Sequence, residues 1–138
     1  MAVIKELIRS EADGSISFGD YELAAKQKVS DFEHQGDLYK VKTFREITKL
    51  ERNDLFVYES VPGTAVTGFA ATGTRADFTV EGAEDVQITL GMMDDTAYEV
   101  LLNGESAGTI TTGLGGKLSF SIELEKAEDV KVAVRTVD

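Results

Sequence analysis

The sequence has no cysteine and a single histidine. Without cysteine, the chain forms no disulfide and has neither a thiolate zinc site nor a cysteine nucleophile. His34 stands beside Gln35-Gly36-Asp37, which is typical of a turn, and no second histidine exists to complete a two-histidine metal site. We therefore expect His34 to be a solvent-exposed loop residue with no catalytic partner.

Proline and long apolar segments are also scarce. One proline and 13 glycines in 138 residues indicate many tight turns and few rigid linkers. No stretch approaches the roughly 20 apolar residues of a membrane-spanning helix, and the N-terminus, with Glu6 near its start, does not have the pattern of a secretory signal. The sequence therefore predicts a chain that does not enter membranes and resides in the cytoplasm.

Basic residues are few compared with acidic ones. The chain has 14 Lys and Arg residues against 25 Asp and Glu, which gives a net charge of −11. Such a chain is repelled by nucleic-acid phosphates and by anionic membrane surfaces, so we expect neither as a partner. The acidic charge either recruits cations and basic partners or keeps the protein soluble at high concentration.

One segment of the chain occurs twice. Residues 81–90 (EGAEDVQITL) reappear 44 residues later as residues 125–134 (EKAEDVKVAV). Each copy follows an alternating run, so both predict a strand, a polar turn and a second strand. We expect the two Ala-Glu-Asp-Val elements to form equivalent turns that enter equivalent strands at Val86 and Val130.

Alternating apolar and polar residues separated by turn signals fill most of the chain. Asn103-Gly104 is the strongest hairpin signal, because both residues accept the positive φ of a type I′ turn. Strands spaced roughly eight to twelve residues apart predict a mainly β protein, an antiparallel sandwich with a jelly-roll-like arrangement. The expected strands are residues 15–21, 28–32, 38–44, 47–50, 55–61, 65–71, 75–80, 86–90, 97–102, 106–111, 117–123 and 130–137.

The beginning of the chain departs from this β pattern. Residues 2–10 have apolar side chains at helical spacing and charged ones opposite them, which predicts a short N-terminal helix. Because a helix of two turns is marginal alone, we expect it to cover the sheet or to contact another copy of the chain. Its apolar positions are Val3, Ile4, Leu7 and Ile8.

Pro62-Gly63 is a strong turn signal near the middle of the chain. It predicts a boundary between an N-terminal β region with the short helix, residues 1–62, and a C-terminal β-sandwich region, residues 63–138. The two regions either form separate small sheets or join in one continuous domain. Two small halves bury a modest fraction of their surface, so we expect a homo-oligomer whose interface includes Ile4, Leu7 or Ile8, or the strand at residues 55–61.

Three adjacent carboxylate pairs are the first candidates for a chemical site. Glu84-Asp85 and Glu128-Asp129 fall in the repeated turn, which indicates shared geometry rather than chemistry. Asp94-Asp95 is the better candidate for a metal, and the chemistry of two neighbouring carboxylates favours calcium. We expect no other cofactor, because the glycine corner at residues 113–116 lacks the residues of a phosphate-binding loop.

Aromatic residues are the second group of candidates. With no tryptophan, a sugar-binding surface would have to use tyrosine rings for stacking. Tyrosines in strands are more often half-buried with a solvated hydroxyl, which is the interpretation that we favour. The four tyrosines are Tyr21, Tyr39, Tyr58 and Tyr98.

Several segments resemble known protein families. Residues 98–104 (YEVLLNG), 108–112 (GTITT) and 116–122 (GKLSFSI) resemble the strands of accessory β-sandwich domains in polysaccharide-active bacterial enzymes. The whole chain, including residues 14–21 (GSISFGDY) and 55–64 (LFVYESVPGT), also resembles a group of short uncharacterised bacterial β-proteins, some of which are labelled endosialidase. The resemblance implies a stand-alone β protein and assigns no site residue.

These observations together favour binding over catalysis. We expect a non-catalytic β-sandwich module for binding or assembly that acts as a homo-oligomer and whose partner is another copy of itself. A carbohydrate-binding module with a glycan partner is the alternative. A glycan hydrolase, which the endosialidase label implies, comes third, because the sequence shows no convergent carboxylate pair and no arginine cluster for a sialic carboxylate.

Overall fold

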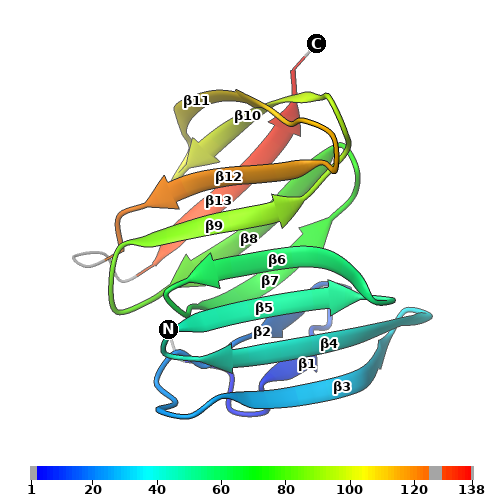
Figure 1. Cartoon of the computed structure of the whole chain (residues 1–138), viewed down its shortest axis with the longest axis vertical. Coiled ribbons are helices and arrows are strands. Elements are labelled where there is room, and N and C mark those ends of the chain that lie inside the picture. Colours follow the sequence, from blue (N-terminus) through cyan, green and yellow to red (C-terminus); the bar gives the residue numbers. More distant parts are fainter. Residues whose placement is uncertain (1–2, 125–128, 138) are drawn as a thin grey trace.

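The computed structural model describes residues 3–124 and 129–137, and these residues form two antiparallel sheets packed face to face (Figure 1). Within this part of the chain there is no helix, and therefore none long and apolar enough to cross a membrane. The strands are β1 (Ile8–Ser10), β2 (Ile16–Phe18), β3 (Gln27–His34), β4 (Asp37–Phe44), β5 (Ile47–Arg52), β6 (Leu55–Val61), β7 (Ala65–Ala71), β8 (Arg75–Glu81), β9 (Val86–Gly91), β10 (Ala97–Leu102), β11 (Glu105–Thr111), β12 (Lys117–Ile122) and β13 (Val130–Thr136).

Each sheet combines strands from both sides of Pro62. The larger sheet has seven strands in the order β1-β2-β7-β8-β13-β10-β11, and the smaller sheet has six in the order β12-β9-β6-β5-β4-β3. The predicted β-sandwich is therefore confirmed. One cluster of buried apolar side chains runs between the sheets and includes residues from before and after Pro62.

The repeated segment builds two matching connections between the sheets. In the first copy, β8 of the larger sheet leads to β9 of the smaller sheet; in the second, β12 of the smaller sheet leads to β13 of the larger one. The copies pair with each other, β8 with β13 and β9 with β12. Val86 and Val130 both begin strands, as predicted. The second turn, residues 125–128, lies outside the described residues.

The Asn103-Gly104 hairpin is also confirmed. These two residues join β10 to β11, and Leu102 is paired with Glu105 across the turn. Their φ angles are 51° and 86°, which is the left-handed region that a type I′ turn requires at both central positions. The sequence signal therefore identified both the turn and its two-residue length.

The predicted N-terminal helix is wrong. Leu7 has a φ of 73°, which no α-helix accommodates, and the chain turns between Ile4 and Leu7 before β1 begins at Ile8. A segment this short gains too few hydrogen bonds to offset the cost of helix nucleation. The turn instead places its apolar side chains directly in the core, where Ile4 is 1% exposed and Ile8 3%.

Burial of this segment also corrects the expected oligomer contact. The side chains of Ile4, Leu7 and Ile8 are covered by their own chain, so this segment offers no apolar face to another copy. The other expected contact, β6, lies between β5 and β9 inside the smaller sheet. At its ends the side chains of Leu55 and Val61 are exposed.

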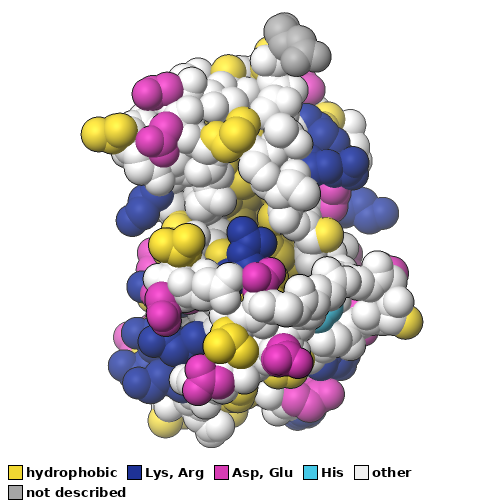
Figure 2. All heavy atoms as spheres, turned by 90° about the vertical axis from the view of Figure 1, so that its right-hand side faces the viewer, with side chains coloured by type: hydrophobic (Ala, Val, Ile, Leu, Met, Phe, Trp, Pro, Cys, Tyr) yellow, Lys and Arg dark blue, Asp and Glu magenta, His cyan; other side chains and the backbone are white. Residues whose placement is uncertain are grey.

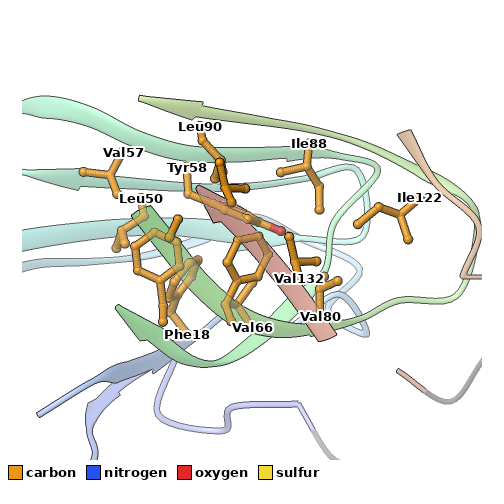
Figure 3. Close-up of a cluster of buried hydrophobic side chains, with 14 of the residues drawn as sticks. Phe18, Leu50, Val57, Tyr58, Val66, Val80, Ile88, Leu90, Ile122 and Val132 are labelled. Carbon is orange, nitrogen blue, oxygen red and sulfur yellow. The ribbon is translucent and has the colours of Figure 1, made fainter. Parts of the chain in front are cut away.

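Aromatic rings form the centre of the core. Phe18 and Phe69 of the larger sheet pack edge-on against Tyr58 of the smaller one, with ring centroids 5.2 and 6.1 Å from that of Tyr58. Phe78 completes the group at 5.8 Å from Tyr58. Figure 3 shows Phe18 and Tyr58 among aliphatic side chains from both sheets that point toward one another. These edge-to-face contacts add to the stability that burial provides.

A chain of buried hydroxyl groups borders this aromatic group. Tyr58 Oη lies 2.7 Å from Thr64 Oγ1, and Ser60 Oγ lies 2.8 Å from the same oxygen. The Thr48 hydroxyl donates to the carbonyl of Thr64 and accepts from its N–H, while Thr43 Oγ1 lies 2.8 Å from Thr48 Oγ1. All five residues are fully buried. The network links three strands of the smaller sheet to the start of β7 in the larger one.

Candidate functional site

A cleft of about 290 Å³ lies between the two sheets. Figure 2 shows the side of the molecule on which it opens, with apolar side chains visible at the bottom of a hollow bordered by charged ones. The cleft is bordered by residues at strand ends: Asp37 begins β4, Arg52 ends β5, Thr72 follows β7 and Arg75 begins β8. Because neighbouring strands alternate in direction, these ends meet at one side of the sandwich although they are distant in sequence.

The floor of the cleft is apolar and its rim is polar. The floor side chains include Val57 and Phe69, which are buried between the sheets. Arg52, Thr72 and Asp77 are among the rim residues. An apolar floor with a few polar groups around it is typical of sites for small organic ligands.

His34 lines this cleft and its side chain is buried. The prediction that His34 is a solvent-exposed loop residue is therefore wrong. The side chain is only 9% exposed, and its ring packs edge-on against Tyr39 at 6.0 Å. Nε2 lies 2.9 Å from the Gly14 carbonyl oxygen, and Nδ1 lies 2.8 Å from Ser10 Oγ. Since the carbonyl only accepts, Nε2 carries a proton. Both nitrogens are occupied, so His34 holds the segment around Gly14 against β3.

The Asp77 carboxylate is tied to two arginines. Its Oδ2 accepts from Arg75 at 2.9 Å and its Oδ1 accepts from Arg135 at 2.8 Å. Partial burial by itself raises the pKa of Asp77, but the hydrogen bonds and charges of the two guanidinium groups outweigh it, and the pKa lies below the ordinary value. Asp77 therefore stays ionised and serves as a hydrogen-bond acceptor rather than as a proton donor.

Arg52 differs from the other two arginines. Its side chain is exposed at the rim, and it makes no hydrogen bond or ion pair with any residue in the described ranges. The neighbouring carboxylate, Asp37, accepts instead from Asn53 Nδ2 at 2.9 Å. Among the described residues, the cleft thus contains one guanidinium group, that of Arg52, whose donors are free to bind an anionic group.

The predicted metal residues lie elsewhere, in the connection between β9 and β10. Asp94 Oδ1 accepts from the Gly115 N–H at 3.2 Å, and the Asp95 N–H donates to the Gly113 carbonyl at 3.2 Å. These bonds hold the glycine corner at residues 113–116 in place. No cluster of three or more His, Asp or Glu side chains suited to a metal occurs among residues 3–124 and 129–137. Calcium at Asp94 and Asp95 stays a prediction.

The tyrosines offer little surface for ring stacking. Tyr58 and Tyr98 are fully buried and Tyr39 is nearly so. These three are therefore core residues, as favoured over ring stacking, but they are more deeply buried than the half-buried rings with solvated hydroxyls that we expected, and the hydroxyls of Tyr58 and Tyr98 bond within the protein. Tyr21 is partly buried, and its hydroxyl donates to Glu81 Oε2 at 2.8 Å. The cleft therefore has a polar rim and an apolar floor, and of the tyrosines only the nearly buried Tyr39 lines it.

Sequence reasoning missed the residues that make this site. Arg52, Arg75 and Asp77 follow no recognisable spacing, because the sheet order rather than the sequence brings them together. One available signal was the position of Arg52 next to the Asn53-Asp54 turn, where side chains gather at one side of a sandwich. Comparison of this chain with protein-family models, with curated proteins and with solved structures finds no match.

Proposed function

We propose that this protein is a non-catalytic binding module whose cleft between the sheets holds a small polar ligand with a carboxylate group. The favoured ligand class is an acidic sugar. The observation that carries this proposal is Arg52, a free guanidinium group at the rim of an apolar-floored cleft. A guanidinium group pairs with a carboxylate through two parallel hydrogen bonds, which gives both affinity and orientation.

The remaining surfaces of the cleft suit the rest of a sugar. Its volume of about 290 Å³ is near the lower limit for small-molecule sites, which fits one sugar ring. The ionised Asp77 supplies acceptor oxygens for hydroxyl groups, and Thr72 supplies a hydroxyl of its own. The apolar side chains of Val57 and Phe69 at the floor match the less polar face of a pyranose.

A titration of sugars by calorimetry tests this proposal. We expect glucuronic, galacturonic or N-acetylneuraminic acid to bind, and glucose and galactose to bind at least about tenfold more weakly, because they lack the carboxylate. Arg52→Gln should abolish the preference for the acids. Arg45→Gln is the matched control, because Arg45 is also exposed and lies outside the cleft. Equal binding of neutral sugars, equal effects of the two variants or no binding of any acid would overturn the proposal.

Self-association is a second candidate function, and the edge strands favour it. Among the four edges, β3 and β11 have register shifts and β1 has only three residues, which are features that hinder pairing with another chain. In contrast, β12 is a regular six-residue edge with no register shift. We therefore infer that further copies would associate by adding strands to β12.

Light scattering on the eluting protein tests self-association directly. We expect a mass above that of the 15.0 kDa chain at micromolar concentration. Ser119→Pro, in the middle of β12, should restore a monomer because proline has no N–H for a partner strand. Ser106→Pro on the other long edge, β11, serves as the control. A monomeric wild type at that concentration contradicts this second function without affecting the first.

A further inference from the structure

The outer face of the smaller sheet has a basic surface on an otherwise acidic protein. Four lysines, Lys28, Lys40, Lys42 and Lys49, surround a hollow of about 170 Å³ together with one carboxylate, Glu51. Figure 2 shows basic side chains gathered at the lower left, over the solvent face of β3, β4 and β5. We call these four residues the lysine row.

The register of the strands forces three of these lysines together. Lys28 of β3 is directly opposite Lys42 of β4, and Lys42 is directly opposite Lys49 of β5. Strands lie about 4.8 Å apart, so the three lysine side chains leave the sheet from backbone positions that span about 10 Å. Like charges directly opposite each other on one face of a sheet are destabilising. The two contacts of Lys42 with Lys28 and Lys49 are therefore unfavourable for the free protein, whereas Lys40 and Lys49 also lie opposite the carboxylates Glu51 and Glu59.

The protein itself compensates this charge only in part. Glu51 lies 3.4 Å from Lys40 Nζ and 3.9 Å from Lys49 Nζ. Lys28 and Lys42 make no ion pair with the described residues. The shortage of carboxylates is local, because outside the row the other ten basic residues (14 less these four) are outnumbered by 24 acidic ones (25 less Glu51).

We propose that the lysine row is a binding site for a compact anion with several charges, of the polyphosphate class. Ammonium groups act as point charges that a phosphate oxygen approaches from many directions, whereas planar carboxylates are better matched by arginine. The anion is compact because a long polyanion that leaves the row meets the acidic surface around it and is repelled. The site is separate from the cleft, so this inference does not depend on the proposed function.

Titration with tripolyphosphate at low ionic strength, followed by amide chemical shifts, tests this site. We expect saturable shifts in β3, β4 and β5, with weaker binding of inorganic phosphate. Lys42→Gln removes the central charge and should weaken tripolyphosphate binding about tenfold or more. Lys131→Gln is the matched control, because Lys131 is an exposed lysine on β13 in the opposite sheet, and it should change the affinity less than twofold. Absence of saturation, or equal losses in both variants, would overturn the proposal.

Two further measurements distinguish this site from ordinary solvated lysines and from a site for long polyanions. In thermal unfolding without added anion at low salt, Lys42→Gln should raise the midpoint, because it removes two repulsive contacts. The rise in midpoint that a fixed concentration of tripolyphosphate gives should be smaller in this variant than in the wild type. A lower midpoint together with an undiminished response to tripolyphosphate contradicts the proposal. So does heparin or duplex DNA binding more tightly than tripolyphosphate, since the anion would then not be compact.

Discussion

The strands of the repeated segment and the strands around the cleft differ in how regularly they pair with their neighbours. The pairs β8–β13 and β9–β12 keep one register along their whole length. The pairs β2–β7, β5–β6 and β7–β8, which contribute to the cleft, each contain a register shift. Bulges bend a strand and redirect its side chains, and they are common beside functional sites. We call the regular pairs the scaffold, and the irregular pairs are those whose shifts redirect side chains beside the cleft that we propose as the binding site.

One consequence is visible in β6. Strict alternation would place Val57 and Tyr58 on opposite faces, yet both are buried. The register between β5 and β6 shifts at Leu50 and Glu51, so Val57 contributes to the floor of the cleft while Tyr58 reaches the aromatic core. A strand with a regular register would bury only one of these two neighbouring side chains.

The largest expected effect is the loss of stability when a core leucine is shortened in the irregular or in the regular part of the sandwich. Leu50 lies in β5 beside the irregular region and Leu90 in the repeated segment, and they are 0% and 1% exposed. Leu50→Ala and Leu90→Ala should each lower the free energy of unfolding by about 3 kcal/mol, because each leaves a cavity in a packed core. Urea unfolding followed by fluorescence and by circular dichroism measures this loss.

Both variants should unfold in one transition, because both sheets and the core include residues from before and after Pro62. Leu114→Ala is the control, since this side chain is 92% exposed and its loss should change stability by less than about 0.5 kcal/mol. Two separate transitions in either variant would mean that residues 1–62 and 63–138 are independent domains.

The second effect concerns the buried hydroxyl network, which belongs to the irregular part. Thr64→Val preserves the shape of the side chain but leaves the hydroxyl groups of Tyr58 and Ser60 without the oxygen that they contact. We expect a loss of about 2 kcal/mol in unfolding free energy, the cost of burying unpaired polar groups. Thr89→Val removes a hydroxyl contact on the solvent face, with Ser119, and should be nearly neutral. Equal effects would show that the network contributes no more than a surface pair.

The same division explains what the sequence could predict. In the repeated segment the side chains alternate, so the strands at Val86 and Val130 followed from neighbouring residues. The two-residue turn at Asn103-Gly104 is likewise encoded by its own two residues. The N-terminal helix failed for a related reason. Apolar residues at helical spacing also suit a chain that turns at Leu7, and a turn fixed by contacts with Gly19 is not encoded locally.

The candidate site could not be predicted because its residues meet only in three dimensions. His34 looked exposed from its turn-like neighbours, yet Gly14 and Ser10, more than 15 residues earlier, cover it. Arg52 and Arg75 line one cleft because β5 ends at the same side of the sandwich at which β8 begins. The lysine row similarly depends on the pairing register of β3, β4 and β5. A shift of one residue in that register would move a lysine to the opposite face of the sheet.

The third effect tests the Asn103-Gly104 hairpin between β10 and β11, which contact the scaffold through β13. Gly104 has a φ of 86°, and an added Cβ there would meet no other atom within 4 Å. Gly104→Ala should therefore lower the unfolding free energy by about 1 kcal/mol through backbone conformation alone. Gly113 has equally open surroundings but no positive φ, so Gly113→Ala is a control that should be neutral or slightly stabilising. If the two variants melt at the same temperature, the left-handed turn is not required for stability.

The smallest expected effect is the pH dependence of folding stability that Asp77, at the rim of the cleft, contributes. The pKa of Asp77 in the folded protein lies below its ordinary value, so its ion pairs stabilise the fold fully above the unfolded-state pKa of about 3.9. This contribution is lost as the pH falls through the folded-state pKa, because the unfolded chain takes up the proton first. The Asp77 side chain is 36% exposed, which limits its contribution at neutral pH to less than about 1 kcal/mol.

Asp77→Asn should therefore be less stable than the wild type at pH 7 in urea unfolding, and this gap should begin to close as the pH falls below the unfolded-state pKa of about 3.9. Asp54→Asn is the control, because Asp54 is exposed and forms no ion pair with the described residues. The gap for Asp54→Asn should be near zero at every pH. A gap for Asp77→Asn that persists unchanged into acid would show that Arg75 and Arg135 hold the rim through packing of their side chains rather than through the charge of Asp77.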